Sequence, residues 1–256
     1  MGFLTDMNAE VRRSLADRPL DVDRLRDEVG AMSSARGFVE AISRGMSVVA
    51  EVKRASPSVG HIADADPADR ARAYTEGGAA AVSVLTEGQH FGGSLEDLRA
   101  VRLATPVPVL RKDFLLDPSQ LLEARACGAD AVLLIAASLS PDALGEMLAT
   151  AEELQLGVLL ETHSLADLEK ALEADARVVG VNARDLETLE VDVERALGMV
   201  SEIPADRIAV LESGVSQRRD VVHAAAAGAR AVLVGEALMR ATDPAAKIRE
   251  LLEGES

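Results

Sequence analysis

Three charged residues follow an apolar run in the segment PVPVLRKDFLLDP, which covers residues 106–118. The run from Val107 to Leu110 has the character of a short buried strand, yet it leads directly into Arg111, Lys112 and Asp113. One such row carries little information, because strands end at surfaces and surfaces are charged. Its meaning depends on whether other apolar runs end in the same way.

The pattern recurs along the chain. Glu51 and Lys53 stand at the end of another apolar run, separated by a single residue. Alternate side chains of a strand point the same way, so this carboxylate and this ammonium can share a pocket. A purely structural ion pair would have the same spacing. The residues that follow the remaining runs include Glu87, Glu161, Asn182, Arg184, Glu212, Ser213, Gly235 and Glu236.

The elements that would position these residues alternate regularly from residue 47 onward. Each unit consists of a short apolar run, a loop, an amphipathic helix and a Gly. Helix starts are marked at 66–67, 117–118 and 140–141, where Asp or Ser precedes a Pro, as is typical of an N-cap and a first helical residue. The predicted strands are Ser47–Glu51, Ala80–Leu85, Pro108–Leu110, Ala131–Ile135, Val158–Leu160, Val178–Val181, Ile208–Leu211 and Ala231–Val234.

Eight apolar strands alternating with helices predict an α/β fold, the (β/α)8 TIM barrel, because an open doubly wound sheet usually has fewer strands. The first 46 residues differ, since helices are predicted over Asn8–Asp17, Asp21–Val29 and Ala35–Arg44 without a strand between them. We expect a single domain in which residues 1–46 form a helical extension and residues 47–256 form the barrel.

Barrels of this kind carry their active sites at the C-terminal ends of the strands. All the predicted strands except the fourth, which ends in the apolar stretch around Ile135, deliver polar residues or glycines to that rim. The loops 212–216 and 234–237, after the last two strands, contain Gly214 and Gly235, which let backbone amides approach a ligand closely. Because barrel enzymes often bind phosphate at these two loops, the sequence favours a phosphorylated ligand.

Composition limits the partners, the compartment and the metal chemistry that we expect. The formal net charge of −16 disfavours nucleic acids and anionic membranes as partners, although a cleft with a positive local field can still bind a small anion. Cys127 is the single cysteine, and the N-terminus lacks the apolar core of a signal peptide, so we expect a cytoplasmic protein. The four histidines have no metal-ligand spacing, and we expect His163, near the rim, to be structural.

These residues, taken in order, resemble the indole-3-glycerol phosphate synthase family of tryptophan biosynthesis. The resemblance covers about residues 47–245, with Ala183 where many members have Asn and Thr162 where Val is more usual. The matching segments are VVAEVKRASPS at 48–58, VSVLTE with HFGGS at 82–94, PVLRKDF at 108–114, VGVNARDL at 179–186, LESG at 211–214 and VLVGEALM at 232–239.

The resemblance implies a carboxy-lyase that needs no cofactor and no metal. Its reaction would be the ring closure, decarboxylation and dehydration of 1-(2-carboxyphenylamino)-1-deoxyribulose 5-phosphate to indole-3-glycerol phosphate. The resemblance further implies that Lys112 is the general acid for ring closure, facing the mouth while Arg111 and Asp113 make structural contacts behind it. The resemblance assigns dehydration and proton transfer to Lys53, Glu51 and Glu161 together. It does not say which of the three is the acid and which is the base. Asn182 would orient Glu51, and Glu212 would hold a substrate hydroxyl or a Lys partner.

The resemblance also assigns the binding residues. Arg184 with Lys53 would meet the substrate carboxylate. The phosphate would be surrounded by Ser56, Ser213, Gly214, Gly235 and the backbone of Glu236, and the aromatic ring by Phe91, Phe114, Leu133 and Leu186. Two alternatives stay open: another phosphate-binding barrel enzyme, such as an isomerase or a Schiff-base aldolase, and a non-catalytic paralogue that binds the product or a partner. The sequence leaves the oligomeric state open, and a monomer is consistent with it.

Overall fold

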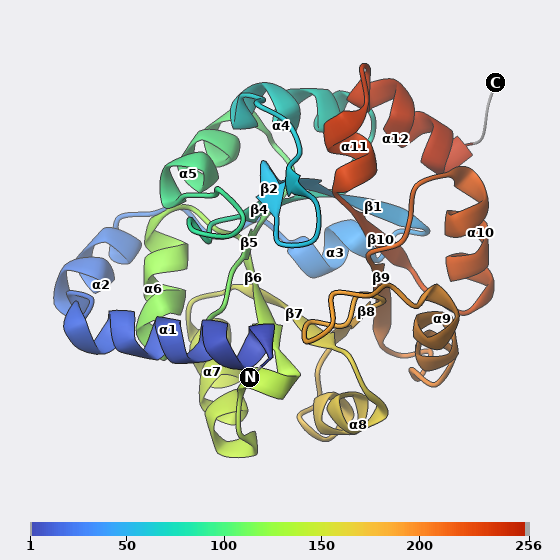
Figure 1. Cartoon of the computed structure of the whole chain (residues 1–256). Helices are drawn as coiled ribbons and strands as arrows, with labels where there is room; N and C mark the ends of the chain where they lie inside the picture. The colour runs from blue at the N-terminus through green and yellow to red at the C-terminus, as the bar shows by residue number, and fades with distance from the viewer. Residues whose placement is uncertain (1, 254–256) are drawn as a thin grey trace.

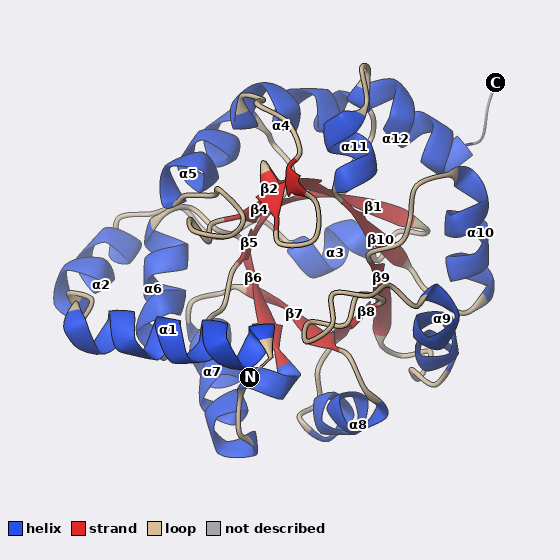
Figure 2. Cartoon of the chain, viewed as in Figure 1, coloured by secondary structure: helices blue, strands red, loops and turns tan. Residues whose placement is uncertain are grey.

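The computed structural model describes residues 2–253, in which eight parallel strands form a closed barrel (Figures 1 and 2). Each strand pairs with its sequence neighbour in the ring, and β1 closes the ring by pairing with β10. The predicted fold class is therefore confirmed. The barrel strands are β1 (Ser47–Val52), β4 (Ala81–Leu85), β5 (Val109–Lys112), β6 (Ala131–Ile135), β7 (Gly157–Thr162), β8 (Val178–Asn182), β9 (Ile208–Glu212) and β10 (Ala231–Val234).

Helices surround the ring of strands (Figure 2). The predicted N-caps are present, because the side chains of Asp66, Asp117 and Ser140 each accept a backbone N–H in the first turn of the helix that follows. The outer helices are α4 (Pro67–Glu76), α5 (Leu95–Ala104), α6 (Pro118–Ala126), α7 (Pro141–Glu153), α8 (Leu165–Glu173), α9 (Val193–Ser201), α10 (Arg218–Ala226), α11 (Glu236–Arg240) and α12 (Pro244–Glu253).

Two short elements interrupt this alternation at the rim. The hairpin of β2 (Ala55–Ser56) and β3 (Gly60–His61) follows β1, and the 3-10 helix η1 (Ala136–Ser138) follows β6. Within residues 2–253, no helix combines the length and the apolar character needed to span a membrane.

The strands bury both of their faces, which explains their nearly continuous apolar sequences. Side chains such as Val49, Leu110 and Leu159 fill the inside of the barrel. Their neighbours along the strands, such as Val48 and Leu160, pack outward against the helices. The charged side chains that point inside, such as Glu51, Lys112 and Glu161, stand near the C-terminal ends of their strands, and this concentrates them at one rim.

The N-terminal segment forms α1 (Phe3–Asp17), α2 (Val22–Gly30) and α3 (Phe38–Ile42). At the bottom of the barrel, Phe38 of α3 packs on the inner cluster beside Gly157, the first residue of β7. At the mouth, Asn8 of α1 donates a hydrogen bond of 3.0 Å to Ser138 in η1. The first helix begins at Phe3 rather than at Asn8 as predicted, because its first turn packs on the inner cluster through apolar side chains.

Candidate active site

A cavity of about 530 Å³ opens at the C-terminal ends of the strands. It collects residues from the barrel strands, from the loops that follow them and from α1. Every site residue predicted from the sequence lines it: Glu51, Lys53, Ser56, Phe91, Lys112, Phe114, Leu133, Glu161, Asn182, Arg184, Leu186, Glu212, Ser213, Gly214, Gly235 and Glu236.

The ammonium of Lys112 lies between two buried carboxylates. Its Nζ donates to Oε2 of Glu161 at 2.7 Å and to Oε2 of Glu212 at 3.0 Å. Burial alone would lower the pKa of Lys112, but the charges of Glu161 and Glu212 outweigh burial, so its pKa lies above the ordinary value. Lys112 is therefore protonated at neutral pH in the free protein, in contact with two groups that can exchange a proton with it.

The two carboxylates beside Lys112 differ in protonation. Burial would raise the pKa of Glu161, but the ammonium of Lys112, with a smaller contribution from His163, holds this pKa well below its usual range. Burial raises the pKa of Glu212 to about 8, and the Lys112 charge offsets only part of this rise. Environments that push two neighbouring carboxyl groups apart in pKa provide one base and one acid in the same site.

Glu51, in β1, and Lys53, just after it, form a second ion pair in the cavity. Oε1 of Glu51 lies 2.8 Å from Nζ of Lys53, and both residues line the cavity. The Glu51 side chain is buried, whereas Lys53 keeps about one fifth of its side-chain surface exposed. The predicted sharing of one pocket by this carboxylate and this ammonium is confirmed.

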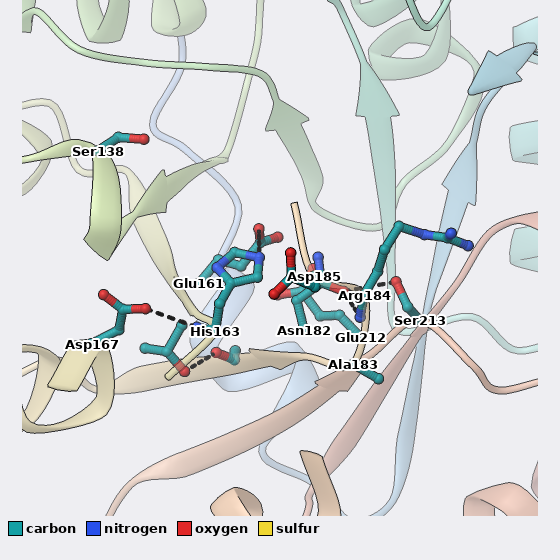
Figure 3. A network of polar contacts seen from close by, with 12 residues as sticks. Ser138, Glu161, His163, Asp167, Asn182, Ala183, Arg184, Asp185, Glu212 and Ser213 are labelled. Carbon is teal, nitrogen blue, oxygen red and sulfur yellow. Dashed lines mark hydrogen bonds and ion pairs between the residues drawn. The ribbon is translucent and has the colours of Figure 1, made fainter. Parts of the chain in front are cut away.

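Asn182, at the end of β8, holds the neighbouring loop rather than Glu51. Its Oδ1 accepts from Oγ of Ser213 at 2.8 Å and from the backbone N–H of Arg184 at 3.0 Å (Figure 3). In the described residues it makes no hydrogen bond to Glu51, so the orientation of Glu51 by Asn182 stays a prediction that no direct contact supports. The side chain of Arg184 lines the cavity and donates to the carbonyl oxygen of Leu189 at 2.7 Å.

The loops after β9 and β10 bring backbone groups to the cavity. Ser213 and Gly214 both have left-handed backbones, with φ of 66° and 76°, and such a conformation is costly for Ser. Gly235 is the N-cap of α11. The carboxylate of Glu236 pairs with Nε of Arg240 at 3.0 Å, so its charge is partly compensated. The hairpin after β1, the strand that pairs with β10, brings Ser56 Oγ to 3.4 Å from Ser58 Oγ.

An apolar slot lies beside these polar groups. The rings of Phe91 and Phe114 have centroids 6.3 Å apart, and Leu133 and Leu186 join the same cluster. Phe3 of α1 completes the slot, with edge-to-face contacts to Phe91 at 6.4 Å and to Phe114 at 6.2 Å. Sequence reasoning missed Phe3, because no motif marks a residue of the extension that a helix carries onto the rim.

Arg111 points away from the mouth, as predicted. It is buried and donates to Thr86 at 3.1 Å, to Asp113 at 3.1 Å and to Glu123 at 2.9 Å. Asp113 departs from the prediction in part, because it borders the cavity, although its Oδ2 accepts from Thr86 at 2.5 Å and from Arg111. These contacts fix the end of β5 from behind.

His163 contacts the catalytic candidates from outside the cavity. Its Nε2 lies 3.1 Å from Oε1 of Glu161 (Figure 3). Its backbone N–H donates to Asp167 at 3.2 Å, and its carbonyl oxygen accepts from Arg195. Over residues 2–253, the acidic side chains, His and Cys form no group of three or more that could hold a metal ion.

The family model and the curated relatives agree on one family. The family model described as indole-3-glycerol phosphate synthase matches residues 3–251. An indole-3-glycerol phosphate synthase from Kineococcus radiotolerans is 49% identical, over 98% of this chain and 95% of that protein, and one from Mycobacterium ulcerans is 52% identical, over 81% and 77%. A thiamine phosphate pyrophosphorylase from Pyrococcus furiosus shares the fold at a TM-score of 0.61 and 18% identity, over 84% of this chain and 96% of that one.

Proposed function

The chain belongs to the indole-3-glycerol phosphate synthase family, and on that premise we propose which of its side chains carry the reaction. The enzyme is a carboxy-lyase of tryptophan biosynthesis that acts on a small phosphorylated substrate. It converts 1-(2-carboxyphenylamino)-1-deoxyribulose 5-phosphate to indole-3-glycerol phosphate by ring closure, decarboxylation and dehydration.

Ring closure needs a proton at the substrate's carbonyl oxygen while the aromatic carbon attacks the carbonyl carbon. Lys112 is the proton donor in this proposal. The observation that carries it is the position of the Lys112 ammonium, which lies in the cavity between Glu161 and Glu212. A substrate oxygen that displaces one of these carboxylates from Nζ would receive the proton, since the departing contact lowers the pKa of Lys112.

Dehydration needs an acid for the leaving hydroxyl and a base for the proton lost from the ring system. Glu161 is ionised and in contact with Lys112, so it suits the base, and a proton taken by Glu161 can return directly to Lys112 over 2.7 Å. The Glu51–Lys53 pair suits the acid that assists departure of the hydroxyl. Glu212, whose pKa is about 8, can donate a hydrogen bond to a substrate hydroxyl in its protonated form.

Substrate binding divides the cavity into three parts. The phosphate binds the loops at Ser213–Gly214 and Gly235–Glu236, with Ser56 on the hairpin beside them. The aromatic ring enters the slot of Phe91, Phe114 and Leu133, roofed by Phe3. The carboxylate meets Lys53 and Arg184. Asn182 remains a proposed site residue. Its role in this proposal is to hold Ser213 by a hydrogen bond rather than to orient Glu51.

The remaining expectations belong to this proposal. The reaction runs without a cofactor or a metal, the protein works in the cytoplasm, and neither nucleic acid nor membrane is a partner. Residues 1–46 and 47–256 act as one domain, since Phe3 of the extension and Phe114 of the barrel meet in the slot.

The test is direct. The purified chain is incubated with the anthranilate-ribulose phosphate, and indole absorbance is followed. Growth of the indole signal supports the proposal, and sodium borohydride should trap no adduct on Lys53 or Lys112. A trapped Schiff base without indole formation would favour an aldolase, and binding of the product without turnover would favour a non-catalytic protein.

A further inference from the structure

Glu212 occupies space that a side chain at position 180 would fill. Gly180 is the middle residue of β8, the strand between β7, which carries Glu161, and β9, which carries Glu212. A Cβ atom on Gly180 would lie 2.2 Å from Oε1 of Glu212, far closer than two such atoms can approach. The backbone of Gly180 needs no glycine for its own conformation, because its φ lies outside the left-handed region.

The oxygen that fills this space is unusual. Oε1 of Glu212 is buried and has no hydrogen-bond partner in the described residues, while Oε2 of the same carboxyl group contacts Lys112 at 3.0 Å. A buried oxygen without a partner costs free energy, so a carboxyl group adopts this position only where the surrounding structure fixes it. The missing side chain at Gly180 provides the place for Oε1, and the direction of Oε2 follows from it.

We propose that Gly180 is a positioning residue for the reaction: the space left by its missing side chain seats one oxygen of Glu212 and so directs the other oxygen at Lys112. This inference rests on the proposed role of the Lys112–Glu212 contact. The same close approach recurs just after β10, where a Cβ atom on Gly235 would lie 2.3 Å from Oε1 of Glu51. Two of the buried carboxylates at the rim thus fill space left by a glycine on, or just after, the neighbouring strand.

The test is a double-mutant cycle between positions 180 and 212. Gly180→Ala should lower kcat by about 10²-fold, because a displacement of about 1 Å in a catalytic group has effects of this size. Affinity for indole-3-glycerol phosphate should stay within about threefold of wild type, since the Glu212 side chain is not among the proposed phosphate contacts at Ser213–Gly214 and Gly235–Glu236 or in the aromatic slot. Glu212→Asp shortens the carboxyl side chain and removes the overlap, so adding Gly180→Ala to it should change kcat by less than about threefold.

Two controls separate positioning from general damage to the barrel. Gly198→Ala lies in α9, where a Cβ atom meets nothing within 4 Å, and it should leave kcat unchanged. Leu159 is the other neighbour of the missing side chain, with its Cδ1 3.1 Å from the Cβ position. The proposal would be overturned if Leu159→Val restored the kcat of the Gly180→Ala variant while Glu212→Asp did not remove the effect of Gly180→Ala on kcat.

A crystal structure of Gly180→Ala gives a readout independent of turnover. The proposal expects the Glu212 carboxyl group to be out of hydrogen-bond distance of Lys112 Nζ. A carboxyl group in its original place, or an equal kcat effect of Gly180→Ala in both backgrounds, overturns it. If Glu212→Ala kept the wild-type kcat, the catalytic role of Glu212 would fall, and the crystal structure would still decide whether Gly180 positions it.

Discussion

Lys112 Nζ and Glu161 Oε2 are 2.7 Å apart. The two residues stand at the C-terminal ends of β5 and β7, which flank β6, and the Glu161 carboxylate is almost fully buried. This contact joins the proposed general acid to the proposed base without an intervening group. A proton lost by Lys112 to the substrate and a proton gained by Glu161 can therefore be exchanged within the pair. The site then returns to its starting state without a route through bulk water for that proton.

The protonation of Glu212 predicts a pH-dependent stability. Its pKa is about 8 in the folded protein, above the ordinary 4.5, so the folded state binds this proton more tightly than the unfolded state. The Glu212 contribution to stability is therefore present below about pH 4.5 and is lost as the pH rises toward 8. Glu212→Gln stays neutral, so its free energy of unfolding relative to wild type should increase between pH 5 and pH 8.5. Urea unfolding at several pH values measures this, and a difference that is constant across the range would contradict it.

A negative charge at position 237 should weaken phosphate binding. Ala237 lines the cavity in the first turn of α11, beside the proposed phosphate loops. Ala237→Asp places a carboxylate near the proposed phosphate and should weaken binding of indole-3-glycerol phosphate about fivefold or more, because like charges this close repel by at least about 1 kcal/mol. Ala237→Asn has the same shape without the charge and should bind normally. Calorimetry with indole-3-glycerol, which lacks the phosphate, should show no effect of either change. An equal loss for Asp and Asn would place the phosphate elsewhere.

We expect Phe3, which completes the apolar slot, to contribute to substrate binding. Phe3→Ala removes the edge-to-face contacts to Phe91 and Phe114 in the slot and should raise KM roughly three- to tenfold, as expected for the loss of about 0.5–1.5 kcal/mol of aromatic interaction. Arg12→Ala, an exposed change on the same helix, should leave KM unchanged. Steady-state kinetics with both variants decides the point. An unchanged KM for Phe3→Ala would remove α1 from the binding site.

Substitution of Arg111 should affect stability rather than turnover, in contrast to substitution of its neighbour Lys112. Arg111→Met leaves the carboxylates of Asp113 and Glu123 without their guanidinium, and breaking a buried ion pair from one side costs about 3–5 kcal/mol. The free energy of unfolding should fall by roughly that amount, while kcat of the folded fraction stays near wild type. Denaturant titration combined with active-site counting separates the two quantities. Loss of kcat in fully folded protein would show that Arg111 faces the chemistry.

The regular part of this structure could be predicted from the sequence because it depends on local patterns. Apolar runs fixed the strands, and Asp or Ser before Pro marked the helix starts. The side-chain alternation along β5 also placed Lys112 and Arg111 on opposite sides. These inferences need only two regularities: side chains alternate every two residues along a strand, and all the strands of such a barrel run in the same direction.

Other parts depend on contacts between distant residues. Phe3 and Phe114 meet because α1 docks across the mouth, and nothing near residue 3 indicates where that helix lies. Asn182 turns to Ser213 because the left-handed backbone of Ser213 presents its hydroxyl there, a detail that the sequence does not contain. The space at Gly180 is visible only once Glu212 is placed beside it.

The central claim is that Lys112 is the general acid, and the kcat of Lys112→Met tests it most directly. Methionine keeps the length and much of the volume of lysine but has no proton to give. We expect kcat to fall by about 10²–10⁴-fold, the usual contribution of a general acid, while affinity for indole-3-glycerol phosphate stays within about tenfold of wild type. A folded Lys112→Met protein that forms indole-3-glycerol phosphate at the wild-type rate would contradict the assignment.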